Sequence, residues 1–291
     1  MSLQRWPLGF NDSPSYAAPL TPWASFPAAL TAEGQIRRPA ELPHVELIAI
    51  GGIWRPRGGR QVLAQRSTNP VTVQSTVLVP AETLGPFPGG LVRAGMRLHF
   101  DFKLTHGAIG NPNRNYHLRI GKLGNTQLFA AATVGGGTVA VGRVVAVLDV
   151  LFDTSAAHQG SFNGSAGIGY GIGNAFMNPT VDFSQSWMLE PWLSSNTETP
   201  VTITGASWSA GVATYTTSAA HTLAVGDKDV IGGITPSGYN TNSNGAIVTA
   251  IGSSTQFSIA MPVDPGTYTS GGTSARISNM QLMAYQLAME G

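Results

Sequence analysis

The chain has 291 residues and a formal net charge of +1, and only 11% of its residues are charged, against a usual ~25% in soluble domains. A net charge so close to zero gives no support to nucleic-acid binding or to a basic membrane-binding patch. The absence of cysteine excludes disulfides and thiolate chemistry, and it fits folding in a reducing cytoplasm. Hydrophobic residues make up 42% of the chain, too many for a disordered protein. The low charge therefore predicts that other subunits cover part of the surface.

No run of eighteen apolar residues occurs, and the opening sequence MSLQRWPLGFNDSP contains no apolar stretch typical of a signal peptide. We therefore expect a soluble protein that carries no export signal.

Residues 1–47 are predicted to form an extended arm. Seven prolines in this segment disfavour both helix and central strand, while its aromatic residues are too many for a free linker. A disordered tail is the alternative, but such tails are ordinarily polar. We expect the aromatic side chains to anchor the arm on a partner, and these are Trp6, Phe10, Tyr16, Trp23 and Phe26.

Residues 48–202 are predicted to form a β-sandwich. The run 97–104 alternates apolar and polar residues, as a half-buried strand does. Its apolar face consists of Leu98, Phe100, Phe102 and Leu104. The runs 46–54, 71–79 and 116–120 have similar patterns, and glycine and proline turns separate them. The run 141–152 is apolar on both faces and rich in β-branched residues, so we expect a central strand buried on both sides.

Residues 203–276 are predicted to form a small β-barrel or sandwich, inserted into the last hairpin of the larger one. Four short alternating runs, separated by turn sequences, predict its strands, and these cover 211–216, 225–231, 246–251 and 256–260. The apolar run 277–291 then continues the larger sandwich as its closing strand. Such a small unit of short strands is marginal alone, so attachment at both ends stabilises it.

Patterns that suggest catalysis or metal binding are weak. Ser165 lies in a sequence that resembles a nucleophile elbow but lacks its first glycine, and Asp149 and Asp153 have no cleft residues beside them. The six histidines do not have metal-ligand spacing, although His99 and His117 would become neighbours if their strands paired. We expect no catalytic residue, no cofactor and no metal site, and hence a protein that is not an enzyme.

The segments 220–227, 233–240 and 261–272 resemble a small β module of tailed-bacteriophage structural proteins. The shared sequence motifs are a His-x-Leu-x-Val-Gly-Asp turn, a Thr-Pro-x-Gly-Tyr-Asn turn and a terminal Ser-Gly-Gly. Separately, the segments 89–102 and 113–121 resemble the jelly-roll domains of phage fibre, spike and capsid-decoration proteins.

This resemblance implies an all-β fold: a jelly-roll β-sandwich with an extended N-terminal arm and an inserted small β domain. It also implies a non-enzymatic homotrimer in the virion, assembled in the host cytoplasm and bound through its arm to major capsid proteins or to tail or portal-vertex proteins. No repetitive shaft occurs, so a compact decoration or spike is favoured over a fibre tip. Whether the protein lies on the capsid or the tail, and in how many copies, stays open.

A receptor-binding module is the alternative function, in which loops of the inserted domain contact a host cell-surface glycan. The candidate contact residues are Tyr239, Asn240 and Tyr268. Packing within turns is the simpler role for the two tyrosines.

Overall fold

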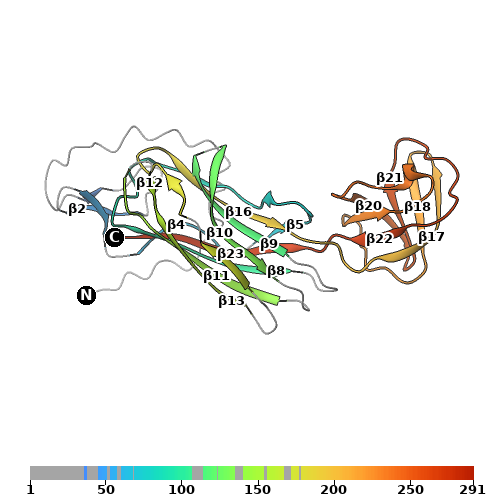
Figure 1. Cartoon of the computed structure of the whole chain (residues 1–291), viewed down its shortest axis with the longest axis horizontal. Helices are drawn as coiled ribbons and strands as arrows, with labels where there is room; N and C mark the ends of the chain where they lie inside the picture. The colour runs from blue at the N-terminus through green and yellow to red at the C-terminus, as the bar shows by residue number, and fades with distance from the viewer. Residues whose placement is uncertain are drawn as a thin grey trace.

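The computed structural model describes residues 36–37, 45–50, 53–57, 60–67, 69–106, 114–122, 124–134, 140–153, 156–166, 172–176 and 178–291. These residues form an all-β protein whose helical content is a single 3-10 turn, η1 (Ser237–Tyr239). The described part is elongated, with a sandwich of two sheets at one end and a closed barrel at the other (Figure 1).

Two antiparallel sheets form the sandwich. The first has the strand order β13-β11-β8-β23-β4, and β5 also pairs with β23. The second has the order β14-β10-β9-β16-β6, and β7 also pairs with β16. The strands of the first sheet are β4 (Gln61–Arg66), β5 (Val71–Val73), β8 (Arg97–His106), β11 (Ala140–Asp149), β13 (Gln159–Ala166) and β23 (Met280–Glu290). Those of the second are β6 (Val79–Pro80), β7 (Leu84–Phe87), β9 (Arg114–Lys122), β10 (Asn125–Val134), β14 (Ile172–Phe176) and β16 (Trp187–Ser194).

The two sheets bury one hydrophobic core between them. The predicted alternation of β8 is confirmed, because its apolar side chains from Leu98 to Leu104 are at most 5% exposed. Phe102 of β8 stacks on Tyr116 of β9, with 4.2 Å between ring centroids. Aromatic contact across the sheets therefore holds the sandwich together near its centre.

The C-terminal strand β23 is an inner strand of the first sheet. It pairs with β8 on one side and with β4 and β5 on the other, and Leu282, Leu287 and Met289 are fully buried. Strand β16, which precedes the barrel in sequence, belongs to the second sheet. The predicted insertion into a hairpin is therefore wrong: the barrel lies in a connection that crosses from one sheet to the other.

Two predicted strands differ from the structure. The run 71–79 is divided between β5 and β6, which belong to opposite sheets, because the chain crosses over at residues 74–78. Strand β11 is not buried on both sides by the described residues: Val145 and Val147 on its outer face are half-buried. Just beyond it, Leu151 and Phe152 are 48% and 51% exposed.

The barrel is closed by six strands in the order β17-β18-β21-β20-β19-β22. Its strands are β17 (Val201–Ser209), β18 (Val212–Thr217), β19 (Lys228–Gly232), β20 (Ala246–Ser253), β21 (Gln256–Ala260) and β22 (Thr273–Arg276). Its first strand thus begins at Val201, two residues before the predicted boundary. A separate core fills it, in which Tyr215 stacks on Phe257 at 5.2 Å and meets Tyr239 edge-on at 6.0 Å.

The remaining strands are short. Strands β1 (Ile36–Arg37), β2 (Leu47–Ile50) and β3 (Ile53–Pro56) form a small sheet outside the two main ones, and β12 (Ala156–Ala157) pairs with β15 (Thr180–Val181). Val45, just before β2, is fully buried in the sandwich core.

Candidate functional site

The barrel joins the sandwich through two short segments that run side by side, one after β16 and one before β23. Thr197 and Ile277 form an isolated antiparallel bridge between them. The hydroxyl oxygens of Ser195 and Ser278 lie 2.7 Å apart, and both Ile277 and Ser278 are fully buried. Hydrogen bonds between the two segments therefore link them into a narrow ribbon.

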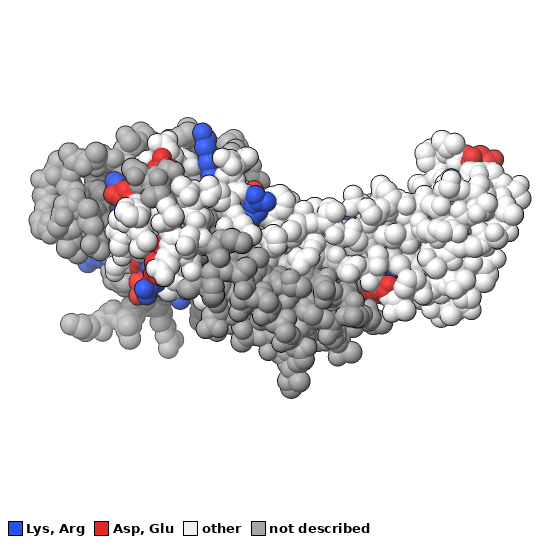
Figure 2. Space-filling view, viewed as in Figure 1, with Lys and Arg blue, Asp and Glu red and all other residues white. Residues whose placement is uncertain are grey.

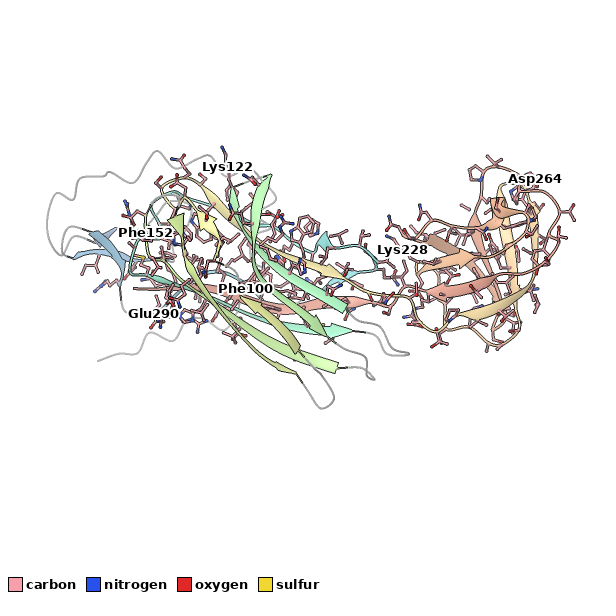
Figure 3. The ribbon with its side chains drawn as sticks, viewed as in Figure 1. Phe100, Lys122, Phe152, Lys228, Asp264 and Glu290 are labelled. Carbon is pink, nitrogen blue, oxygen red and sulfur yellow. The ribbon has the colours of Figure 1, made fainter. Side chains whose placement is uncertain are left out.

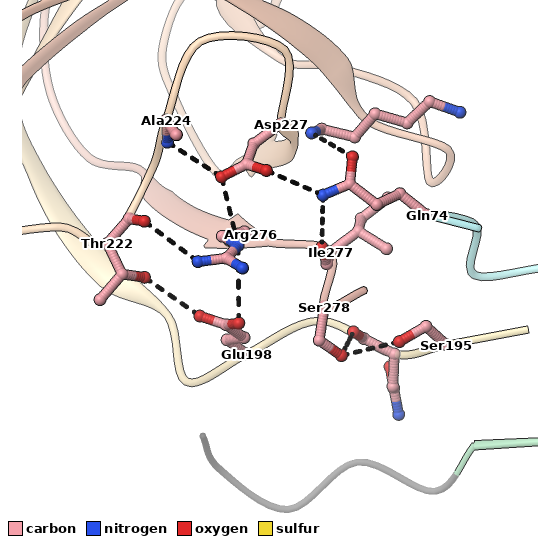
Figure 4. A network of polar contacts seen from close by, with 11 residues as sticks. Gln74, Ser195, Glu198, Thr222, Ala224, Asp227, Arg276, Ile277 and Ser278 are labelled. Atoms are coloured by element: carbon pink, nitrogen blue, oxygen red, sulfur yellow. Dashed lines mark hydrogen bonds and ion pairs between the residues drawn. The ribbon is translucent and has the colours of Figure 1, made fainter. Parts of the chain in front are cut away.

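Arg276, the last residue of β22, forms ion pairs with two acidic residues at the base of the barrel (Figure 4). Its Nε lies 3.3 Å from Asp227 Oδ2 and 3.6 Å from Glu198 Oε1. Its Nη1 donates to the carbonyl oxygen of Thr222 at 3.0 Å, and the Thr222 hydroxyl donates to Glu198 at 3.2 Å. One guanidinium thus holds together the ribbon, the loop before β19 and the end of β22.

Gln74, in the crossover between β5 and β6, connects the sandwich to this cluster (Figure 4). Its amide nitrogen donates to Asp227 Oδ1 at 3.0 Å, and its amide oxygen accepts from the backbone N–H of Lys228 at 3.3 Å. Two residues further on, the Thr76 hydroxyl donates to the carbonyl oxygen of Ser243 at 2.8 Å. The barrel is therefore held by side-chain contacts as well as by its two covalent connections.

Asp229 on β19 is the innermost acid of this region and is 0% exposed. The Ser274 hydroxyl donates to its Oδ2 at 2.7 Å, while its Oδ1 has no hydrogen-bond partner among the described residues. Burial raises the pKa of Asp229 to about 7; the nearby charges of Asp227 and Glu198 add to the rise, and the hydrogen bond from Ser274 opposes it. Burial, with the adjacent Tyr239 and Asp229, also raises the pKa of Tyr215.

Few charged residues lie in the barrel sequence. Among residues 201–276, they are Asp227, Lys228, Asp229, Asp264 and Arg276. Three of these take part in the buried region at the base, so the visible surface of the barrel is almost uncharged (Figure 2). Asp264 lies at the end away from the sandwich (Figure 3). This surface offers hydroxyl groups and backbone, together with exposed apolar side chains at Val212, Val225, Ile247, Ile251 and Val263.

The three residues predicted to contact a glycan have internal roles. Tyr239 is 1% exposed and its hydroxyl donates to the carbonyl oxygen of Gly266 at 3.0 Å. The Asn240 side chain is hydrogen-bonded to both backbone groups of Ile234, and Tyr268 is half-buried. Because the Tyr239 ring is enclosed in the barrel core, it has no free face on which a sugar could stack. The simpler prediction, packing within turns, describes these side chains.

A depression of about 420 Å³ lies at the end of the sandwich away from the barrel. Its charged groups are paired: Arg97 Nε lies 2.5 Å from Asp149 Oδ1, and His99 Nε2 lies 2.8 Å from Glu290 Oε2. Its lining residues are Gly95, Met96, Arg97, Asp149, Val150, Leu151, Gln159, Glu290 and Gly291. Its two acidic side chains, Asp149 and Glu290, are therefore each held by a basic side chain.

The other candidates for chemistry are separated from one another. Ser165 lies in β13, where its backbone position pairs with Arg143 of β11. Asp153 accepts from the backbone N–H of Ala94 at 2.7 Å. His99 and His117 lie on opposite sheets, so their strands do not pair. No group of three potential metal ligands occurs in the described part of the chain.

The predicted arm anchors, Trp6, Phe10, Tyr16, Trp23 and Phe26, lie outside the described residues. Conversely, the polar cluster at the barrel base was not predicted. A sequence signal for it exists: in the run Asp227-Lys-Asp-Val-Ile, period two places Asp229 on the same face as the apolar Ile231. An acid on an otherwise apolar strand face indicates a buried carboxylate.

The fold and the junction therefore define an all-β protein with two cores and a polar connection between them. Comparisons of the chain with protein-family models, with curated proteins and with solved structures found no match. Within the described ranges, no helix is long and apolar enough to cross a membrane.

Proposed function

We propose that the chain is a non-enzymatic structural component of a tailed-phage virion. In this proposal it is a trimeric jelly-roll decoration or spike protein, bound to capsid or tail through its N-terminal arm. Its mechanism is association: subunits pack through the sandwich, the arm attaches to the particle, and the barrel is displayed outward.

Strand order is the observation that carries this proposal. Reading inward from one edge, β4, β23, β8 and β11 form one sheet, and β6, β16, β9 and β10 form the other. Among these eight strands, each is followed along the chain by a strand of the other sheet, except that β9 is followed by β10 of the same sheet. An eight-stranded jelly roll with two Greek keys has this arrangement. Viral capsid proteins are among the proteins that use this architecture. The resemblance of the barrel sequence to phage modules points in the same direction.

The exposed apolar side chains support self-association. Val145 and Val147 on the outer face of β11 are half-buried, and Leu151 and Phe152 beyond it are about half exposed. Obligate interfaces are more hydrophobic than ordinary protein surface and commonly exceed ~2,000 Å². A face of this composition, on a chain with so few charges, fits burial against a second and third copy.

Deletion of residues 1–35, which removes all five predicted anchors and keeps β1 and the buried Val45, tests the role of the arm. We expect the truncated protein to stay folded and oligomeric but to be missing from purified particles, as measured by mass spectrometry of those particles. Incorporation at normal occupancy would refute the arm assignment. The copy number in the same measurement separates the two locations: hundreds of copies indicate shell decoration, and a small multiple of three indicates a tail or vertex.

Glycan binding by the barrel is the second candidate, and the uncharged barrel surface favours it, because neutral sugars are bound through hydroxyl and apolar contacts. Purified protein that adsorbs to host cells and blocks infection would support it. Particles that lack the protein and still adsorb would exclude it.

A further inference from the structure

Asp229 has an environment in which a charged carboxylate is poorly accommodated. It points into the barrel from β19, on the same face as the fully buried Ile231. One of its oxygens receives a single hydrogen bond, from Ser274, and the other has no partner among the described residues. A buried carboxylate normally needs a cation or several donors to remain ionised.

The arginine opposite Asp229 on the neighbouring strand is engaged with other acids. Arg276 is the backbone partner of Asp229 across β19 and β22, but the ion pairs of its guanidinium are with Asp227 and Glu198. Lys228, the next residue along, is half-buried on the opposite face of β19. The two ion pairs of the guanidinium are thus made with residues other than Asp229, while the charges of Asp227 and Glu198 act on Asp229.

Two other titratable side chains of the barrel interior have contacts away from Asp229. From β18, the Tyr215 hydroxyl donates to the carbonyl oxygen of Tyr239 at 2.9 Å. From the loop before β19, the ring of His221 packs edge-on against Phe257 at 5.5 Å.

We propose that Asp229 is a proton-binding site that controls how firmly the barrel is held to the sandwich. When Asp229 is a neutral carboxylic acid, it does not compete for Arg276. The ion pairs of Arg276 with Asp227 and Glu198 then persist, and so does the hydrogen bond between Gln74 and Asp227. When Asp229 loses its proton to solvent, the new carboxylate competes for Arg276. The ion pair to Asp227 weakens, and the contact with Gln74 weakens with it.

The direction of the pH effect follows from the raised pKa of Asp229, which is about 7 in the folded barrel against an ordinary value of 3.8. A folded state that holds the proton more tightly than the unfolded state loses stability as the pH rises between the two values. The equilibrium constant for opening the barrel should therefore rise from about pH 4 to about pH 7, by up to about tenfold per pH unit, and then level off. An ordinary ion-paired carboxylate has the opposite dependence.

Hydrogen exchange of the full chain between pH 5 and 8.5, corrected for the intrinsic exchange rate, tests the proposal. We expect amides of β19 and β22 to lose protection as the pH rises from 5 to about 7, and to show no further loss above about pH 7. Asp229→Asn is nearly isosteric and permanently neutral, so its protection in these strands should not change with pH. Asp264→Asn removes an exposed carboxylate from the same barrel and should keep the wild-type profile.

The proposal is overturned if Asp229→Asn retains the wild-type pH dependence, or if Asp264→Asn abolishes it. Carbon-13 NMR of the aspartate carboxyl groups in the wild-type chain decides the matter independently, including the case where Asp229→Asn does not fold. A carboxyl resonance assigned to Asp229 that titrates near pH 7 supports the site, whereas one already ionised at pH 5 refutes it.

Discussion

The sandwich and the barrel place their charges differently. The sandwich pairs charged residues near its surface, as in Arg97–Asp149 and Arg66–Glu82 at 2.5 and 2.7 Å. The barrel concentrates its charged residues at its base and leaves its outer surface nearly uncharged. The difference indicates separate roles: the base of the barrel positions it on the sandwich, while its outer surface is free of long-range electrostatic attraction or repulsion.

Phe102→Ala should give the largest loss of stability, and it tests whether the two cores unfold independently. Phe102 is 1% exposed and stacks on Tyr116, so its truncation should destabilise the sandwich by about 3–5 kcal/mol. Denaturant-dependent hydrogen exchange should then show loss of protection in β8 and β9, while β18 and β21 keep theirs. Equal loss in the barrel would mean that the two cores unfold as one. Val77→Ala, at a half-exposed position, is the matched control.

Arg276→Met should have the next largest effect, and it acts on the junction. The substitution keeps much of the side-chain length but leaves Asp227 and Glu198 without their shared cation. Removal of one partner from a largely buried ion pair is strongly destabilising, and we expect about 2–3 kcal/mol here because Arg276 is 18% exposed. Calorimetry should show a lowered barrel transition and an unchanged sandwich transition. A fall confined to the sandwich would contradict the assignment of Arg276 to the barrel base.

Gln74→Ala should have the smallest effect, about 1 kcal/mol, because it removes neutral and charge-assisted hydrogen bonds without opening a core. The substitution should also let the barrel move more relative to the sandwich. Distance measurements between spin labels, one on each core, would detect this motion as a broader distribution of distances. Gln281→Ala is a suitable control, since the Gln281 amide group donates to Thr72 and accepts from Thr105, both in the sandwich. An unchanged distribution in Gln74→Ala would show that the two covalent connections alone fix the barrel.

Strands with clear alternation could be predicted from the sequence. The run 97–104 is such a case, because only one of its faces is apolar and that face lies in the core. The run 71–79 was predicted as one strand, since every residue suits a strand and nothing local marks the change of sheet at Gln74. The incomplete burial of Val145 and Val147 was missed for a related reason. Apolar residues on both faces of a strand show that burial is favoured, but they do not show which element provides it.

The junction between the barrel and the sandwich could not be predicted from the sequence, because the residues that form it are far apart along the chain. Gln74 and Asp227 are 153 residues apart, and only the crossover between the sheets brings them together. Asp229 was the detectable member, as an acid in phase with Ile231, but its pairing with Ser274 depends on the closure of the barrel.

The central claim of this account is that the sandwich builds the assembly while the barrel is a separate body carried on it. The most direct measurement is native mass spectrometry of the full chain and of a chain in which residues 201–276 are replaced by a short glycine-serine linker. We predict that both chains are folded and that both have the mass of three copies. A shortened chain that fails to fold, or that is monomeric while the full chain is trimeric, would contradict the claim.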